Sequence, residues 1–120
     1  MYQLCKAVLG QPITVTGWKT GEDWVISVFG GSRPHIGSVT TAYWAEGHLE
    51  VKTILLPAHR DNVVGERFAE AVAEQTGKTV CVTCGIHYEN PSKEDLAAIV
   101  SACEELLEEW KTLILCVTLK

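Results

Sequence analysis

Apolar and polar residues alternate with a period of two along most of the first half of the chain, which is the pattern of half-buried β-strands. Runs rich in β-branched and aromatic residues occur at 13–19, 23–29, 36–44 and 49–56, and short turn sequences separate them. Residues 2–9 add a further run, which Pro12 separates from the next one. The pattern therefore predicts four or five consecutive strands arranged as an antiparallel meander.

The spacing of apolar residues changes to that of a helix between Asp61 and Thr76. The residues on the apolar side of this helix are Val64, Phe68, Ala71 and Val72. Asp61 is suited to the N-cap, and Gly77 is suited to the C-terminal end. We expect a strand at 78–86 to follow.

A second helix is predicted after Pro91, because Ser92 and Asp95 have the spacing of a capping box. Its apolar stripe consists of Leu96, Ile99, Val100, Cys103, Leu107 and Trp110. Glutamates occupy the opposite side of the helix, which we interpret as solvated. The final run, TLILCVTL (112–119), predicts a last strand.

This order of elements predicts an α+β fold for one domain spanning residues 1–120, with two helices packed on a largely antiparallel sheet. The net charge of −5 argues against a nucleic-acid partner. No run reaches the about 18 apolar residues of a membrane span, and the N-terminus lacks the features of a signal peptide. We therefore expect a cytoplasmic protein with no membrane partner.

The five cysteines are expected to be reduced thiols, because their number is odd and no signal peptide precedes them. Cys81 and Cys84 form a C-x-x-C motif inside the β-branched run KTVCVTCGI. Residues three apart in a strand point to opposite faces. We therefore interpret both as small core-filling side chains rather than as a redox or zinc pair.

The predicted strand directions bring three loops to one end of the sheet, which we call the rim: residues 30–37, 57–61 and 85–89. Three histidines gather at the rim, and charged residues accompany them: His35, His59 and His87 with Arg33, Arg60, Asp61 and Glu89. His48 falls in a turn at the opposite end. Both helices also begin at the rim, and helix N-termini favour anions. We therefore expect a functional site there.

The stretch GGSRPHIGSV (30–39) favours binding of a phosphate-bearing small molecule. Its glycines allow a ligand to approach the backbone, and Arg33, next to Pro34, offers a fork of donors to a phosphate. The stretch lacks the P-loop and G-x-G-x-x-G patterns, so neither an NTPase nor a Rossmann enzyme is supported.

Two kinds of catalytic chemistry are alternatives to this ligand-binding interpretation. His35, His59 and His87 could provide a three-histidine metal site with an open position, although no local metal-binding signature exists. Nucleophilic catalysis has weaker support. The candidates, Ser32, Ser38 and Cys84, do not lie in a nucleophile elbow.

Three blocks of the sequence, GGSRPHIGSV, AHRDN and CGIHYENPSKEDLAAIV, resemble the small subunit of hydroxyarylic-acid (gallate-type) decarboxylases. These small subunits form the LpdD-like family of prenylated-flavin chaperones, whose domain is similar to proteasome assembly chaperones. The resemblance covers about residues 23–103.

The resemblance implies a role other than catalysis. The protein would bind prenylated flavin mononucleotide (prenylated FMN) as cargo, and hold it or deliver it to a partner decarboxylase as a chaperone or accessory subunit. The implied binding residues are Gly30, Gly31, Arg33, Pro34, His35 and Gly37, then His59 and Asp61, then Gly85 and His87. The chain departs from the family at Ala58 and Arg60, where glycine and lysine are expected.

Three further residues are candidates on their own chemistry. Arg60 is a second cation for the phosphate, and Tyr88 and Glu89 lie beside His87. Tyr88 is a candidate wall for the flavin ring, as is Trp44 if it lies near. Two alternative functions stay open: a metal-dependent enzyme that uses the three histidines, and an assembly chaperone without a ligand. We also expect a homodimer, formed through exposed sheet edges or the run TLILCVTL.

Overall fold

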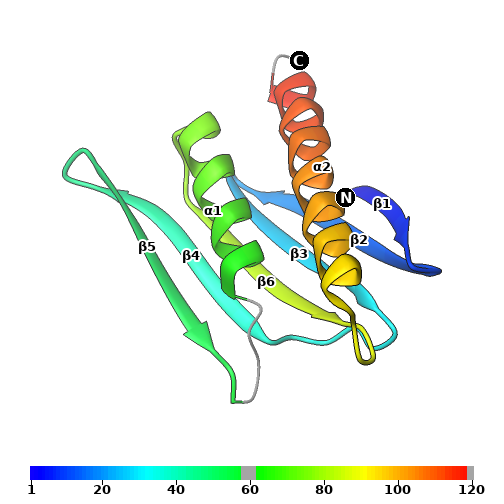
Figure 1. Cartoon of the computed structure of the whole chain (residues 1–120). Coiled ribbons are helices and arrows are strands. Elements are labelled where there is room, and N and C mark those ends of the chain that lie inside the picture. The colour runs from blue at the N-terminus through cyan, green and yellow to red at the C-terminus, as the bar shows by residue number, and fades with distance from the viewer. Residues whose placement is uncertain (58–61, 119–120) are drawn as a thin grey trace.

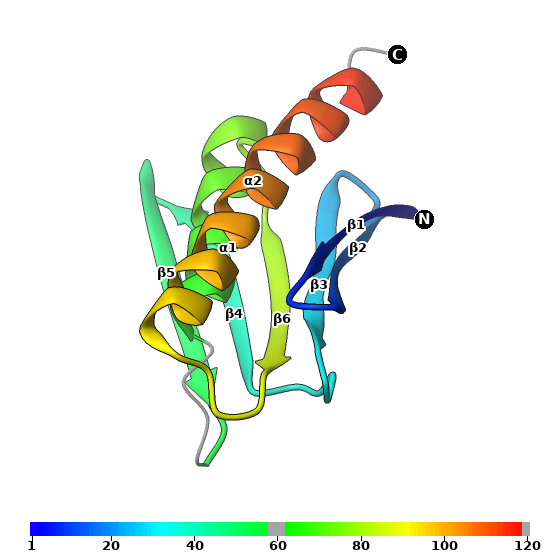
Figure 2. The same cartoon turned by 45° about the vertical axis from the view of Figure 1, so that its right-hand side comes forward.

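The computed structural model of the protein describes residues 1–57 and 62–118, which form six strands and two helices (Figure 1). In chain order these are β1 (Tyr2–Val8), β2 (Gln11–Thr20), β3 (Asp23–Gly31), β4 (Ser38–Ala45), β5 (His48–Leu55), α1 (Asn62–Thr76), β6 (Val80–His87) and α2 (Lys93–Thr118). The strands form one sheet, and both helices lie on the same face of it (Figure 2). The predicted α+β fold is confirmed.

The sheet has the strand order β1-β2-β3-β6-β4-β5, so it is not the simple meander that the sequence predicts. Strand β6 lies between β3 and β4, parallel to β3 and antiparallel to β4. Its side chains toward the helices, Val80, Val82 and Cys84, are at most 1% exposed. A strand this apolar is best buried in the middle of a sheet, but the alternation within each strand does not specify its neighbours.

Residues 112–118 belong to α2, so the strand predicted at TLILCVTL is wrong. Ile114 is fully buried and continues, at helical spacing, the stripe that contains Leu107 and Trp110. This packing outweighs the β propensity of the run. At the other end of α2, Leu96 and Val100 belong to the predicted apolar stripe but are 50% and 57% exposed.

Two predicted helix ends are confirmed: the N-terminal end of α2 and the C-terminal end of α1. The amide of Asp95 donates to Oγ of Ser92, and the amide of Ser92 donates to Oδ2 of Asp95, both at 3.0 Å, which is a capping box. Gly77 has a φ of +70°, and its amide donates to the carbonyl of Ala73 at 2.8 Å. The expected N-cap, Asp61, lies outside the described residues.

The core lies between the helices and one face of the sheet. Trp110 of α2 is fully buried and stands nearly perpendicular to Trp24, with 6.2 Å between the ring centroids. Gly17 lies directly beneath Trp110, since a Cβ at Gly17 would overlap the indole ring. Among the described residues, no helix is long and apolar enough to cross a membrane.

No helix among the described residues covers the opposite face of the sheet, which we call the helix-free face (Figure 2). Away from the strand ends, the pairing register assigns to it these residues of the four inner strands: Thr14, Thr16, Trp18, Val25, Ser27, Phe29, Val39, Thr41, Tyr43, Cys81 and Thr83. None of these eleven residues carries a charge, and all except the exposed Trp18 are buried or half-buried, whereas the edge strand β5 adds the exposed Glu50 and Lys52 to this face. A sheet face exposed to water normally carries charged and strongly polar residues.

The five cysteines all lie in the described ranges and form no disulfide with one another. Cys84 is buried in the core, as predicted, whereas Cys81 is half-buried on the helix-free face. Cys103 belongs to the buried side of α2, and this burial, with a smaller contribution from Glu104, raises the pKa of its thiol to about 11.

This difference in burial predicts selective alkylation. At pH 8, iodoacetamide should modify the exposed Cys5 and Cys116 and leave Cys84 and Cys103 unmodified in the native protein. The thiolate is the nucleophile, and a raised pKa keeps Cys103 protonated until the pH approaches 11. Peptide mass spectrometry would read out the pattern, with urea-unfolded protein as the control in which all five react. Modification of Cys103 as fast as that of Cys116 would contradict the burial.

Candidate functional site

The structure brings the predicted rim together at one end of the sheet, the lower end in Figure 1. Gly31, the last residue of β3, is in register with His87, the last residue of β6. Strand β4 begins there at Ser38, and Ser38 is in register with Leu55 at the end of β5. His48 lies at the opposite end, as predicted. Helices α1 and α2 also begin at the rim.

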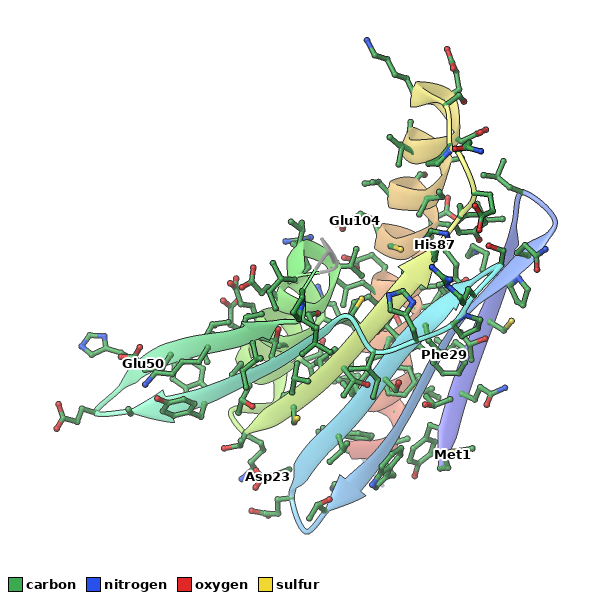
Figure 3. All side chains as sticks on the ribbon, turned by 90° about the horizontal axis from the view of Figure 1, so that it is seen from below. Met1, Asp23, Phe29, Glu50, His87 and Glu104 are labelled. Atoms are coloured by element: carbon green, nitrogen blue, oxygen red, sulfur yellow. The ribbon has the colours of Figure 1, made fainter. Side chains whose placement is uncertain are left out.

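The loop of residues 32–37 has to cross the end of β6, because it connects two strands that β6 separates (Figure 3). Two backbone hydrogen bonds of 2.8 Å hold it there: the amide of Ser32 donates to the carbonyl of His87, and the amide of Gly37 donates to the carbonyl of Cys84. The carbonyl of Gly37 in turn accepts from the amide of Leu56 at 2.9 Å. The crossing loop is thus fixed at both ends.

Glycines at two positions make this crossing possible. A Cβ at Gly85 would overlap the carbonyl oxygen of His35, so the loop passes directly over this residue on the helix-free face. Gly31 has a φ of +82°, and a Cβ there would overlap the carbonyl oxygen of His87. Gly31, predicted to let a ligand approach the backbone, and Gly85, implied as a binding residue by the resemblance, both bring backbone close to backbone.

The two described histidines of the rim are both oriented by local contacts. Nδ1 of His35 lies 3.0 Å from the carbonyl oxygen of Arg33, a hydrogen bond that requires the proton on Nδ1. Nε2 of His87 lies 3.1 Å from Oε1 of Glu89. Both imidazoles are half-buried, so each can meet a ligand without losing its anchor.

Arg33 is exposed, and its guanidinium has no hydrogen bond or ion pair within residues 1–57 and 62–118. Arg67, by comparison, forms a bidentate pair with Glu104. An arginine on a fixed loop, without a carboxylate of its own, is suited to bind an external anion.

Tyr88 is placed differently from the other rim residues. Its hydroxyl donates to the carbonyl of Val8 at 3.1 Å, with the carbonyl of Gln11 at 3.3 Å, and its ring packs against the core. Partial burial raises the pKa of its phenol, and Cys103 adds to the effect. Tyr88 thereby ties the β1–β2 hairpin to the rim.

A cavity of about 300 Å³ adjoins Tyr88, with Ser32, Glu89 and Asp95 among its lining residues. Its two carboxylates make this side of the rim unsuited to a phosphate. Arg33 and His35 are not among the residues that line this cavity, and Arg33 is the better anion site.

Phe29 is a rim residue that the sequence reasoning missed. It lies on the helix-free face in register with Gly85, the residue over which the loop crosses, and Figure 3 labels it at the same end as His87. The alternation within β3 groups Phe29 with Val25 and Ser27 but does not reveal that the loop passes on that face. Trp44, the conditional candidate for a flavin wall, lies at the far end, where its Nε1 donates to the carbonyl of Ala73 at 3.2 Å.

Part of the predicted site lies outside the described residues: Ala58, His59, Arg60 and Asp61. The three-histidine metal site includes His59 and is therefore not tested. Within the described ranges, no group of three or more histidine, cysteine, aspartate or glutamate side chains is placed to hold a metal ion.

Comparison with known proteins identifies the family. The profile of the prenylated flavin chaperone LpdD-like domain matches residues 8–115. The chain belongs to this LpdD-like family. Protein LpdD of Lactiplantibacillus plantarum is 32% identical over 91 residues, which cover 72% of this chain and 65% of the relative, so the match spans slightly less than two thirds of that protein.

Membership of the LpdD-like family supports a chaperone function without catalysis. The fold is also similar to that of a chaperone complex for yeast 20S proteasome assembly, with a TM-score of 0.51 over 92% of this chain and 95% of the other. The sequence identity there is 14%, so this likeness concerns the fold alone.

The crossing of the loop over Gly85 predicts the effect of adding one methyl group. Gly85→Ala should lower the free energy of unfolding by about 3 kcal/mol, because the loop must lift off β6 or the strand must shift. Gly47→Ala is the control: it has a φ of +79° and open space around it, so about 1–2 kcal/mol from backbone strain alone is expected. Urea denaturation measures both, and equal losses would show that the loop does not press on Gly85.

Proposed function

We propose that the protein binds prenylated FMN at the rim and holds it, or delivers it to a partner aromatic-acid decarboxylase. The observation that carries the proposal is Arg33, an unpartnered cation among the described residues, on a fixed loop that also carries His35 and is bonded to the end of β6 at His87. Membership of a prenylated flavin chaperone family supports the identity of the cargo.

The phosphate of the cofactor is assigned to Arg33 rather than to the N-terminus of α2. The capping box of Ser92 and Asp95 already occupies backbone donors at that N-terminus. Glu94 and Asp95 also place negative charge in the first turn, which repels an anion. The guanidinium of Arg33 can donate two parallel hydrogen bonds to one phosphate.

The flavin ring is assigned to the helix-free face beside the loop. Phe29 supplies an aromatic surface there, and His35 and His87 supply ring nitrogens that can hydrogen-bond the polar edge of the flavin. His59, Arg60 and Asp61 stay part of the proposed set. Binding of this kind requires neither a nucleophile nor a metal.

The cellular setting belongs to the proposal as well. A partner decarboxylase would use the cofactor that this protein carries. We place both proteins in the cytoplasm, and the five thiols without a disulfide support this location. An assembly chaperone without a ligand stays the alternative, and absence of flavin binding would favour it.

Removal of the Arg33 side chain tests the proposed site. Arg33→Ala should weaken binding of reduced prenylated FMN by about 10- to 100-fold, the loss of one charged hydrogen-bonding group, about 1.5–3 kcal/mol. Anaerobic calorimetry or absorbance titration measures the affinity. Arg67→Ala is the matched control, because Arg67 lies in α1 and is bound to Glu104.

Two outcomes would count against the proposal. Unchanged affinity in Arg33→Ala would remove Arg33 from the site. Equal affinity for plain FMN and prenylated FMN would remove the specificity for the prenylated cofactor.

We also propose a homodimer and assign it to the part of the helix-free face away from the rim, around Val25, Thr41 and Cys81, so that Phe29 and the loop stay open to cargo. The predicted contribution of TLILCVTL as a sheet edge is no longer available, because these residues are helical up to Thr118. The inner-strand residues at that end are uncharged, and the exposed Trp18 is in register with Val25, so a second copy could pack there sheet against sheet.

A charge in the middle of this face should prevent dimerisation. Val25→Arg places a guanidinium on the helix-free face of β3, where burial against a second copy would cost several kcal/mol. Native mass spectrometry should show a dimer for the wild type and for Leu115→Arg, and a monomer for Val25→Arg. A monomeric wild type, or a dimer that tolerates Val25→Arg, would refute this interface.

A further inference from the structure

Exposed apolar side chains gather where the two helices begin. Val63 of α1 is 64% exposed, and Leu96 and Val100 of α2 are 50% and 57% exposed. The first two turns of α2 thus continue the apolar stripe of the helix without being buried by the described part of the chain. Exposure of three large apolar residues in one place marks an interaction surface rather than a solvated helix.

A groove lies between these helix ends. Helices α1 and α2 run side by side from the rim, as Figures 1 and 2 both show. A cavity of about 320 Å³ lies between them, with Phe68, Cys103 and Leu107 as its buried floor and Val63 and Val100 on its walls. We call this cavity the helix groove.

An ion pair bounds the helix groove on the side away from the rim and separates it from a second cavity between the helices. Arg67 and Glu104 lie one helical turn beyond Val63 and Val100 and form a bidentate ion pair across the gap, at 3.1 Å and 2.9 Å. This pair holds the two helices at a fixed separation. The apolar part of the groove is therefore preformed, which lowers the entropic cost of filling it.

The charges around the helix groove indicate what could fill it. Helix α2 carries six acidic side chains and two lysines, and α1 carries three glutamates and one arginine. The two charged residues that line the groove, Arg67 and Glu104, are paired with each other, but the helices around it carry net charges of −4 (α2) and −2 (α1). An apolar groove in such an acidic helix layer fits an amphipathic helix that inserts apolar residues and carries lysine or arginine beside them. A second copy of this chain is a poor occupant, because both of its helices are acidic.

We infer that the helix groove is the docking site for an amphipathic, basic-flanked helix of the enzyme that receives the cargo. This inference rests on the proposed delivery function, because an acceptor has to approach the rim, and the helix groove opens at the rim. The acceptor binds the helix side of the rim, while Arg33 and Phe29 hold cargo on the helix-free side. Docking and cargo binding thus use different residues.

The experiment exploits two leucines of α2 that differ in position but hardly in exposure. Leu96 is 50% exposed at the rim end, and Leu115 is 51% exposed at the far end. The probe is the apo form of a prenylated-flavin-dependent aromatic-acid decarboxylase from the same organism. Leu96→Asp and Val100→Asp should each weaken its binding at least tenfold, whereas Leu115→Asp should change it less than twofold.

Two further measurements separate docking from folding and from cargo binding. All three variants alter exposed positions and should keep the wild-type unfolding midpoint and the wild-type affinity for reduced prenylated FMN. Raising NaCl from 50 to 500 mM should weaken enzyme binding, because the attraction is between opposite charges. Hydrogen exchange in the complex should show protection over residues 93–104 and in one helix of the enzyme.

The outcomes are distinct. Equal loss in Leu96→Asp and Leu115→Asp, protection away from the helix groove, or no binding of the enzyme to the wild type overturns the docking site. Flavin binding that persists in those cases leaves the proposed cargo function intact. Absence of flavin binding by the wild type refutes the cargo function, and enzyme binding at the groove would then be that of an assembly chaperone.

Discussion

The position of β6 between β3 and β4 is the constraint on which the rest of the site depends. Two strands that are consecutive in the chain but not adjacent in the sheet cannot be joined by a hairpin turn. Their connection has to pass over the end of the strand between them, and it can pass closely only where that strand has no side chain. Gly85 provides this position, and the amides of Ser32 and Gly37 fix the loop to β6. Arg33 and His35 therefore occupy a short, doubly anchored bridge.

The same arrangement separates the two faces of the molecule. All of the buried core lies on the helix side, where Trp110 and Phe68 pack against the sheet. The loop crosses on the other side, next to Phe29. A ligand at the loop therefore does not compete with the core for space, so binding and release of cargo need no opening of the hydrophobic core. For a carrier this is a useful property, because cargo exchange then costs little of the folding free energy.

The sequence specified those features that depend on local chemistry. The alternation of apolar and polar residues identified the strands that the structure contains, and the reciprocal hydrogen bonds of Ser92 and Asp95 follow directly from their spacing.

The order of the strands could not be predicted in this way, since each strand has the same alternation whichever neighbour it has. The run TLILCVTL has strand-like composition, but it continues α2, and Ile114 is buried at helical spacing from Trp110. The rim was predictable because strand direction survives the change in strand order, as the pairing of Gly31 with His87 shows. The place of Phe29 at the rim was not predictable, because it depends on the face of the sheet that the loop crosses.

Electrostatics explain why anion and partner would occupy opposite sides of the rim. A helix N-terminus is ordinarily a site for anions, yet α2 begins with Glu94 and Asp95 and caps its own amides. An anionic cofactor is thereby directed away from the helix layer and toward Arg33. The acidic helix layer, in turn, attracts a basic surface, and a basic surface would compete with Arg33 for the phosphate if the two met. A partner that docks on the acidic side and brings its own cations to the rim would draw the phosphate from Arg33. Under the proposed delivery function, this charge distribution would favour transfer of the cofactor in one direction, from the chaperone to the enzyme.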